Sequence, residues 1–308
     1  MNNRTLLGKA AIDTETLTNG GKMNPEQSAQ FITFMKDFSS FLRNVDTINM
    51  QAPRRILEYG DASKRNMRLQ KENQENAPTG TFKTSNRELN AVGVIMPYDI
   101  TFQFMKENIE KGNVNTTLAS LFAQQFANDT VDLGFNGDES LTTDSFLAIN
   151  DGWIKICESD TQTHKYDTAG STDMMKIFSD MLSMVPSKYF QIYQEEDKNL
   201  LKILVSHHDN RAYKDQLTLR NTALGDSILI SGKNVTYDGF EIIPVGFIPD
   251  GVRMVTPLKN LAYGIYGNGL ETYHEVKPRY LKHEYTLLAD IDFEIHNPDV
   301  VVIGKKRT

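Results

Sequence analysis

The chain has 308 residues and a mass of 34.9 kDa, enough for about two domains or one elaborated domain. Its hydrophobic fraction of 39% and charged fraction of 24% are typical of folded proteins and exclude wholesale disorder. The 33 basic and 40 acidic residues give a net charge of −7, which argues against a generally basic nucleic-acid binder. The single cysteine, Cys157, excludes an intrachain disulfide and a cysteine-based zinc site. No apolar run approaches the ~20 residues of a membrane span, and the first residues lack a signal peptide's apolar stretch, so we expect a soluble chain made in a cytoplasm.

The first strong predicted element is an amphipathic helix that begins at Asn24. Asn24 is a favourable N-cap, Pro25 suits the first helical position, and Gln27 stands where a capping box needs it. Apolar residues then recur at helical spacing as far as Val45, and four of them are phenylalanines: Phe31, Phe34, Phe38 and Phe41. This stripe has to be covered, either by the rest of its own domain or by a neighbouring subunit.

Residues 53–92 form a long polar excursion. Between residues 54 and 90 there are five acidic and eight basic residues, a net charge of +3 that leaves −10 for the rest; the basic residues are Arg54, Arg55, Lys64, Arg65, Arg68, Lys71, Lys83 and Arg87. Alternation at 64–69 and 81–85 predicts a two-stranded hairpin, which would need another surface to lie on, and its charge would suit an acidic one. The alternative is a solvated mobile loop.

The middle of the chain mixes short strands and helices. We expect a strand at 92–96 closed by Pro97, a helix from the cap Asp99 to Lys111, and a second helix from the cap Asn115 to Gly134. Strands are expected at 146–149 and 153–157, separated by a glycine turn and followed by a polar linker at 158–170.

The second half is richer in strands. A helix capped by Thr172 or Asp173 ends at Pro186, and a helix capped by Asp209 follows a buried strand at 201–205. Further strands are expected at 227–230, 235–237, 240–245, 252–256, 261–265, 270–275, 285–295 and 300–303. The irregular alternation of helices and strands indicates an α+β fold.

No motif in the chain predicts catalysis. His207 and His208 would point to opposite faces of a strand rather than share a metal, and Asp209 has a sufficient role as a helix cap. The acids at 132–139 lack the register of a calcium loop, and the glycines at 264–269 are not followed by a phosphate-binding helix. We therefore expect no enzymatic activity, no cofactor and no metal.

Several stretches together resemble, in order and spacing, the major capsid proteins of tailed double-stranded-DNA bacteriophages with the Hong Kong 97-type fold. The similarity is greatest to the P2-like capsid branch and covers nearly the whole chain, with 217–226 as its most specific part. The stretches are 24–31, 45–55, 97–100, 132–138, 151–155, 217–226, 237–242, 256–261 and 295–302.

The resemblance implies a domain division and a function. The domains would be an N-terminal arm (1–52), an extended loop (53–96), a peripheral domain with a long spine helix (97–170), an axial domain with a central sheet flanked by helices (171–280), and a return to the peripheral domain (281–308). It implies hexamers and pentamers in an icosahedral virion shell around packaged DNA, assembled in the bacterial host cytoplasm. We expect the eight basic loop residues and the four phenylalanines to make the contacts between subunits.

Partners and alternatives also follow from the resemblance. Because about 23 residues precede the arm helix, we expect a separate scaffolding protein, together with a portal. A net-acidic wall would enclose DNA without sequence-specific binding and release it readily. Some relatives cross-link a loop lysine, but nothing identifies a partner for Lys64, Lys71 or Lys83, so we expect no cross-link. An encapsulin-like compartment that encloses cargo enzymes is the main alternative, and an enzyme using His207, His208 or Asp209 is a third.

Overall fold

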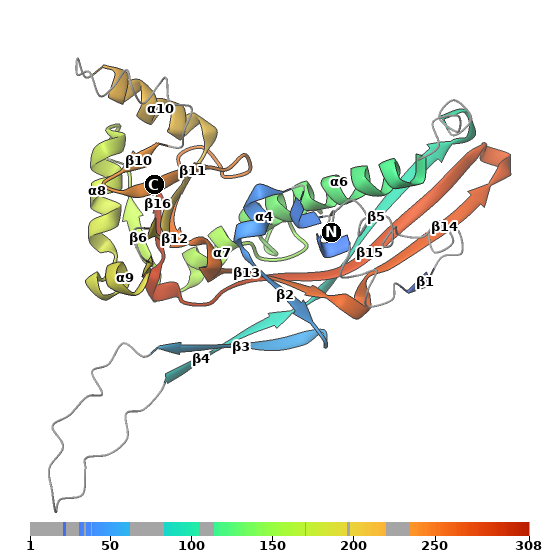
Figure 1. The fold of residues 1–308 in the computed structure, drawn as a ribbon, viewed down its shortest axis with the longest axis horizontal. Coiled ribbons are helices and arrows are strands. Elements are labelled where there is room, and N and C mark those ends of the chain that lie inside the picture. Colours follow the sequence, from blue (N-terminus) through green and yellow to red (C-terminus); the bar gives the residue numbers. More distant parts are fainter. Residues whose placement is uncertain are drawn as a thin grey trace, which may run out of the picture.

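The computed structural model describes residues 21–22, 31–33, 35–37, 39–61, 83–104, 114–169, 171–195, 198–219 and 235–307. These residues form two bodies, each built on its own six-stranded sheet, and a hairpin that projects from them (Figure 1). We call the two sheets the long sheet (β1, β14, β15, β13, β2 and β5) and the compact sheet (β10, β11, β9, β12, β16 and β6). In the part of the chain that the structure describes, no helix is long and apolar enough to cross a membrane.

The long sheet is organised around β15 (Lys282–Ile295). β14 (Glu271–Lys277) and β13 (Leu261–Tyr266) pair with it one after the other along one edge, and β5 (Val92–Thr101) pairs along the other. Ile291 has partners on both sides, Ile265 in β13 and Val92 in β5. Along β15, the pairing with β5 therefore stops at the residue where the pairing with β13 starts. The short strands β2 (Asp46–Met50) and β1 (Gly21–Lys22) complete the sheet.

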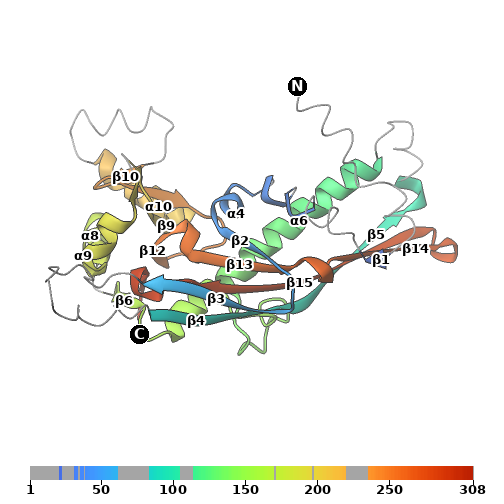
Figure 2. The same cartoon turned by 60° about the horizontal axis from the view of Figure 1, so that its bottom comes forward.

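One face of the long sheet is covered by α6 (Val114–Asn136), which runs along it (Figures 1 and 2). The buried Trp153 of α7 (Trp153–Ser159) contacts Phe135 of α6 and Phe293 of β15 edge to face, each at 5.2 Å between ring centroids. The short helix α4 (Ser40–Asn44) begins at the cap Ser39, whose hydroxyl accepts from the Leu42 N–H at 3.2 Å. Aromatic packing therefore joins α6 and α7 to β15.

The compact sheet has β9 (Leu201–Val205) at its centre, parallel to β11 (Phe240–Pro244) and antiparallel to β12 (Arg253–Pro257). Its other strands are β10 (Thr236–Tyr237), β16 (Val302–Lys305) and β6 (His164–Asp167). The helices packed with it are α8 (Met174–Met184), α9 (Ser187–Ile192) and α10 (His207–Thr218) (Figure 1). The described residues also form β7 (Gln194–Glu195), β8 (Lys198–Asn199) and short 3₁₀ turns at 258–260, 267–269, 278–280 and 298–300.

The α+β class is confirmed, and so are several predicted elements. The strand at 201–205 has the predicted bounds, and α8 begins at Asp173, whose carboxylate accepts from the Met175 N–H at 3.0 Å. Residues 31–33 and 35–37 are helical, as expected for the N-terminal segment, but the chain leaves the helix at Ser39 before α4. The predictions at 24–30, 64–69 and 227–230 lie outside the described residues.

Two predicted strands are wrong. Residues 153–157 form part of the helix α7, and residues 146–149 lie in turns. The buried side chains in this stretch are Trp153, Ile154 and Cys157, a spacing that one face of a helix satisfies and that alternation in a strand does not. A run this short fits either period, and packing against α6 decides between them.

The boundaries around Pro97 are also corrected. Pro97 lies inside β5 rather than at its end, and Asp99 is a strand residue opposite Glu284 rather than a helix cap. β5 pairs with β15 as an edge strand of the long sheet. An edge strand tolerates proline, because the N–H that proline lacks can face away from the ladder. The next helical residues begin at Phe102, and the long helix α6 continues through Gly134 to Asn136.

Strand pairing in the two sheets does not follow the order of the chain. β13 and β14, expected in the axial domain, belong to the long sheet, whereas β16, expected in the peripheral domain, lies in the compact sheet. β6 lies within the expected polar linker and joins the compact sheet as well, and residues 92–96, at the end of the expected extended loop, form the first part of β5. The chain therefore crosses between the two bodies more often than contiguous domains would require.

Candidate assembly surfaces

The most prominent candidate surface is the hairpin of β3 (Arg54–Asp61) and β4 (Lys83–Asn90). The two strands pair antiparallel from Arg54–Asn90 to Asp61–Lys83 and project from the body (Figures 1 and 2). A hairpin is thus present in the predicted segment, and β4 overlaps the predicted strand at 81–85, whereas the predicted strand at 64–69 lies outside the described residues. An isolated two-stranded ribbon is marginally stable, so its root contacts decide how it is held.

The apolar part of the root is a small separate core. Leu57 and Leu89 are buried with Ile48, Met50 and Ala262, which come from the edge of the long sheet. Gly264 makes this approach possible, because a Cβ there would lie 2.8 Å from the Met50 Sδ and 2.9 Å from a Leu89 methyl carbon. Leu89 therefore packs directly on the face of β13.

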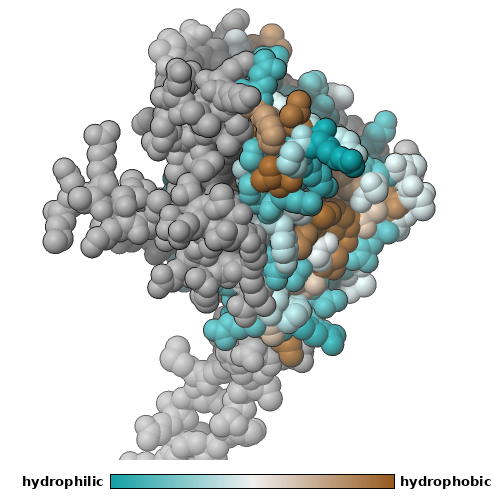
Figure 3. Space-filling view, turned by 90° about the vertical axis from the view of Figure 1, so that its right-hand side faces the viewer, coloured by the Kyte–Doolittle hydropathy of each residue, from teal (hydrophilic) through white to brown (hydrophobic). Residues whose placement is uncertain are grey.

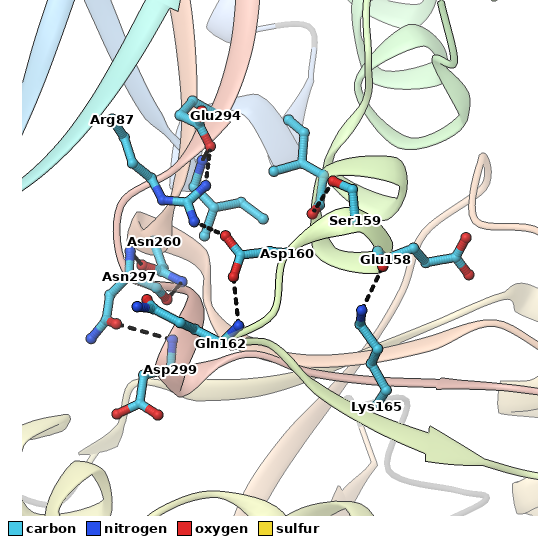
Figure 4. Close-up of polar contacts among 12 residues, drawn as sticks. Arg87, Glu158, Ser159, Asp160, Gln162, Lys165, Asn260, Glu294, Asn297 and Asp299 are labelled. Atoms are coloured by element: carbon cyan, nitrogen blue, oxygen red, sulfur yellow. Dashed lines mark hydrogen bonds and ion pairs between the residues drawn. The ribbon is translucent and has the colours of Figure 1, made fainter. Parts of the chain in front are cut away.

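The polar part of the root is centred on Arg87. Its guanidinium lies between two carboxylates, Asp160 at the end of α7 and Glu294 of β15, with 2.8 Å from Nη1 to the Glu294 Oε1 (Figure 4). All three side chains are at most 17% exposed. Since partly shielded ion pairs are screened less than exposed ones, this cluster ties β4 to both α7 and β15.

A second polar contact lies beside the first. The backbone N–H of Asn90 donates to the Asp292 Oδ2 at 2.6 Å. Burial raises the pKa of Asp292 to about 6, and the nearby charges of Glu294 and Glu139 raise it too, while the N–H groups of Asn90 and Phe293 oppose the rise. The charged form of Asp292 is therefore less stable in this buried position than it would be in water.

The structure separates the basic residues predicted to contact other subunits. The Arg87 guanidinium is paired inside the chain with Asp160 and Glu294, and its predicted contact with another subunit stays a prediction. Arg54 is exposed and pairs with Glu88 across the hairpin, with 2.7 Å from Nη2 to Oε2, and the exposed Arg55 donates to the Asn49 carbonyl at 3.2 Å. Lys83 is placed in β4 opposite Asp61. Lys64, Arg65, Arg68 and Lys71 lie outside the described residues.

The phenylalanine stripe favours packing within the chain. Phe31 is buried against Phe126, at 5.7 Å between ring centroids, and Phe41 packs at 5.2 Å from Phe135 and 6.0 Å from Trp153. Both residues pack within the chain, which is the alternative that the sequence left open, and their contacts with another subunit stay a prediction. Phe34 and Phe38 lie outside the described residues.

Sequence reasoning missed the acidic partners of the hairpin: Asp160, Asp292 and Glu294. A signal for two of them was available, because acids at 290, 292 and 294 alternate with buried apolar residues at 291, 293 and 295. Alternation of this kind places all three acids on one face of a strand. An acidic face on a long central strand needs a partner, and the basic loop was the candidate.

The far end of the long sheet is a second candidate surface. The turn at Pro278–Tyr280 joins β14 to β15 and is followed by Leu281 in the left-handed region, with φ +50°. Tyr280 is 73% exposed, and Leu281, Val276 and Tyr273 are exposed as well. Figure 3 shows apolar side chains among hydrophilic ones on this side of the molecule.

The histidine pair is arranged differently from the prediction. His207 and His208 lie in the first turn of α10 rather than on a strand, and Ser206 rather than Asp209 caps the helix. Asp209 is buried and pairs with Arg253 at 3.0 Å, which is a structural role. Among the residues that the structure describes, no group of three or more His, Cys, Asp or Glu side chains could hold a metal ion.

No family model matches the chain. A Bacillus subtilis (strain 168) protein, provisionally named as a prophage capsid protein, YqbE, is 31% identical over 239 residues, which cover 75% of this chain and 72% of that protein. An alignment this long at this identity relates the two chains as members of one family.

Solved structures agree on the fold. The procapsid of satellite phage P4, in a structure that includes the size determination (Sid) protein, matches with a TM-score of 0.68 at 12% identity, covering 91% of this chain and 99% of that one. The holo-SrpI encapsulin complex from Synechococcus elongatus PCC 7942 matches with a TM-score of 0.53 at 10% identity, covering 87% and 89%. The encapsulin likeness is one of fold alone, whereas the relationship in sequence is to a prophage capsid protein. The chain therefore belongs to the phage capsid protein family, as a structural shell protein with the Hong Kong 97-type fold.

Proposed function

We propose that the chain builds the icosahedral head of a tailed phage or prophage, as hexamers and pentamers around packaged double-stranded DNA. The observation that carries this proposal is the hairpin, which leaves the body and packs on it through the root residues Leu57 and Leu89. A two-stranded ribbon gains little stability by itself, so the part beyond the root needs a further surface. A neighbouring copy in a shell supplies that surface.

The contacts proposed between copies are electrostatic. Residues 54–90 carry a net charge of +3 within a chain of net charge −7. Complementary charge steers partners and fixes their register more than it adds affinity. With Arg87 used inside the chain, the remaining basic loop residues are the proposed contacts: Arg54, Arg55, Lys64, Arg65, Arg68, Lys71 and Lys83.

We assign domain roles by sheet rather than by contiguous segments. The body of the compact sheet with α8, α9 and α10 is the proposed axial domain, and the long sheet with α6 is the proposed peripheral domain. The hairpin is the proposed extended loop, and the segment before β2 is the proposed arm. This division follows hydrogen-bonded pairing, which is what holds each body together.

Further partners follow from the charge and the family. The acidic balance favours enclosure of DNA without sequence-specific binding, because a basic wall would hold phosphates tightly. We propose assembly in the bacterial host cytoplasm, with a separate scaffolding protein and a portal. We propose no catalysis and no cofactor.

Electron microscopy of particles made by the full chain tests the proposal. We expect regular shells with pentameric vertices when the scaffolding protein is supplied, and DNA in the mature particles. A chain that stays monomeric under all conditions would contradict shell assembly, and closed regular shells formed by this chain alone would contradict the separate scaffold. Particles that hold protein cargo instead of DNA would favour the encapsulin-like alternative.

A charge variant tests the hairpin contacts. The double change Arg54→Ala and Arg55→Ala should reduce the yield of shells, because it removes exposed positive charge from the hairpin. The matched control, Lys176→Ala with Arg211→Ala, removes the same charge from exposed positions on α8 and α10. Equal yields from the two double variants would remove the hairpin from the proposed contacts.

A further inference from the structure

The root of the hairpin has an unusual arrangement of hydrogen bonds. β4 precedes β5 in the chain, and the backbone ladder between β5 and β15 begins only at Val92, opposite Ile291. From this point β15 holds β4 through side chains: Asp292 accepts the Asn90 N–H and Glu294 pairs with Arg87. The attachment of the hairpin therefore depends on carboxylates rather than on backbone pairing alone.

These carboxylates face the hairpin directly. Gly264 of β13 is the cross-strand partner of Asp292, so the two residues share one face of the long sheet. Leu89 packs on that face at Gly264, as its close approach to the glycine shows. β4 thus lies over the face that presents Asp292, and lifting β4 would expose the Asp292 carboxylate to water.

The groups around Asp292 make its charge unfavourable. Its own strand adds Asp290 and Glu294 on the same face, the turn after α6 adds Glu139, and the end of α7 adds Asp160, so four further acids lie in this region. β4 contributes Arg87, which is committed to Glu294 and Asp160, and the Asn90 N–H. β13 offers a glycine at this position, and β5 contributes the uncharged Val92 and Gly93. No basic group is paired with Asp292 itself among the described residues.

We propose that the hairpin root is a proton-controlled hinge, in which a proton on Asp292 holds β4 down and its loss loosens β4. The docked carboxyl binds a proton more readily than a hydrated one, since burial raises its pKa to about 6 against an ordinary value of about 3.9. By linkage, the docked state is favoured as the pH falls through about 6 and loses that advantage as the pH rises above it. Arg87 and Leu89 contact the body in either state, so the root loosens without detaching.

This inference concerns motion inside one chain and does not rest on the proposed shell contacts. Hydrogen–deuterium exchange of the full chain, followed at the root amides 89–91 and corrected for intrinsic exchange rates, measures the hinge. Between about pH 7.5 and about pH 5 we expect protection to rise about tenfold, with the rise setting in near pH 6. Protection that is constant, or that falls as the pH is lowered, would overturn the proposal.

Two variants identify the group that titrates. Asp292→Asn should hold the root in its protected state at every pH and flatten the profile, whereas Asp290→Asn, on the same face but without a bond to β4, should keep the slope. If Asp292→Asn does not fold, Glu139→Gln serves instead, because loss of its charge should shift the onset of the rise to lower pH. An unchanged profile in both Asp292→Asn and Glu139→Gln would sink the hinge.

Discussion

The two ends of the long sheet are built in opposite ways. At the hairpin root, Leu89 and Arg87 are covered by their own chain, and their partners come from β13, β15 and α7. At the far end, Tyr280 and Leu281 are exposed. Lys277 and Lys282 lie on that end's surface and pair with Glu284 at 2.5 and 2.7 Å, which lowers the pKa of Glu284. The root residues make their contacts within one chain, whereas the apolar side chains at the far end are exposed to other molecules.

This difference separates stability from assembly. Buried contacts at the root fix the direction of the hairpin before any neighbour arrives. Exposed ion pairs contribute little to stability and weaken as salt is added. We therefore expect changes at the root to alter the free energy of unfolding, and changes at the far end to leave it almost unchanged.

The largest effect is expected at Leu89. Leu89→Ala should lower the free energy of unfolding by about 3 kcal/mol, because it leaves a cavity in the small core of the root. Ile56→Ala is the matched control on the same hairpin, since Ile56 is exposed, and it should cost less than about 0.5 kcal/mol. Chemical denaturation of both variants checks the pair, and equal losses would mean that the root is not a buried core.

The next effect is expected at Arg87. Arg87→Ala leaves Asp160 and Glu294 without their shared partner, and we expect a loss of about 2 kcal/mol. Arg54→Ala, which removes an exposed arginine from the same hairpin, should cost less than about 1 kcal/mol. Denaturation at neutral pH measures both, and a smaller loss for Arg87→Ala than for Arg54→Ala would contradict the role given to the root.

A smaller effect is expected at Gly264. Gly264→Ala places a methyl group against Met50 and Leu89, and we expect a cost of about 1 to 2 kcal/mol together with faster exchange of the root amides. Gly246→Ala is the control, because a Cβ there meets nothing within 4 Å. If both variants are neutral, β4 does not pack as closely on β13 as the structure shows.

The smallest effect is expected at the far end. Leu281 has a φ of +50°, in the left-handed region that glycine adopts without strain. Leu281→Gly should therefore change the free energy of unfolding by less than about 1 kcal/mol, with relief of strain offsetting the lost side chain. Thermal unfolding measures this, and a loss as large as that of Leu89→Ala would erase the contrast between the two ends.

Local patterns in the sequence were enough for some elements. The strand at 201–205 and the helix α8 carry their own signals, a buried apolar run and the cap Asp173 with Pro186 beyond the end. The hairpin was predictable only in part, because alternation at 81–85 indicated a strand that β4 overlaps, whereas the polar composition fitted a solvated loop equally well. The segment at 153–157 was not, since five residues fit either a strand or a helix until α6 is in place.

The sequence by itself determined the class of the fold, the family and the net positive charge of the hairpin, because these depend on composition, spacing and order along the chain. Tertiary structure alone decided which sheet each strand joins and which charges are used internally. β16 and β6 pair in the compact sheet although their first paired residues, His164 and Val302, are 138 positions apart in the sequence. Arg87 finds Glu294 in the same way, across 207 positions. Contacts of this kind depend on which distant segments of the chain the fold brings together. No local pattern of residue types encodes that arrangement.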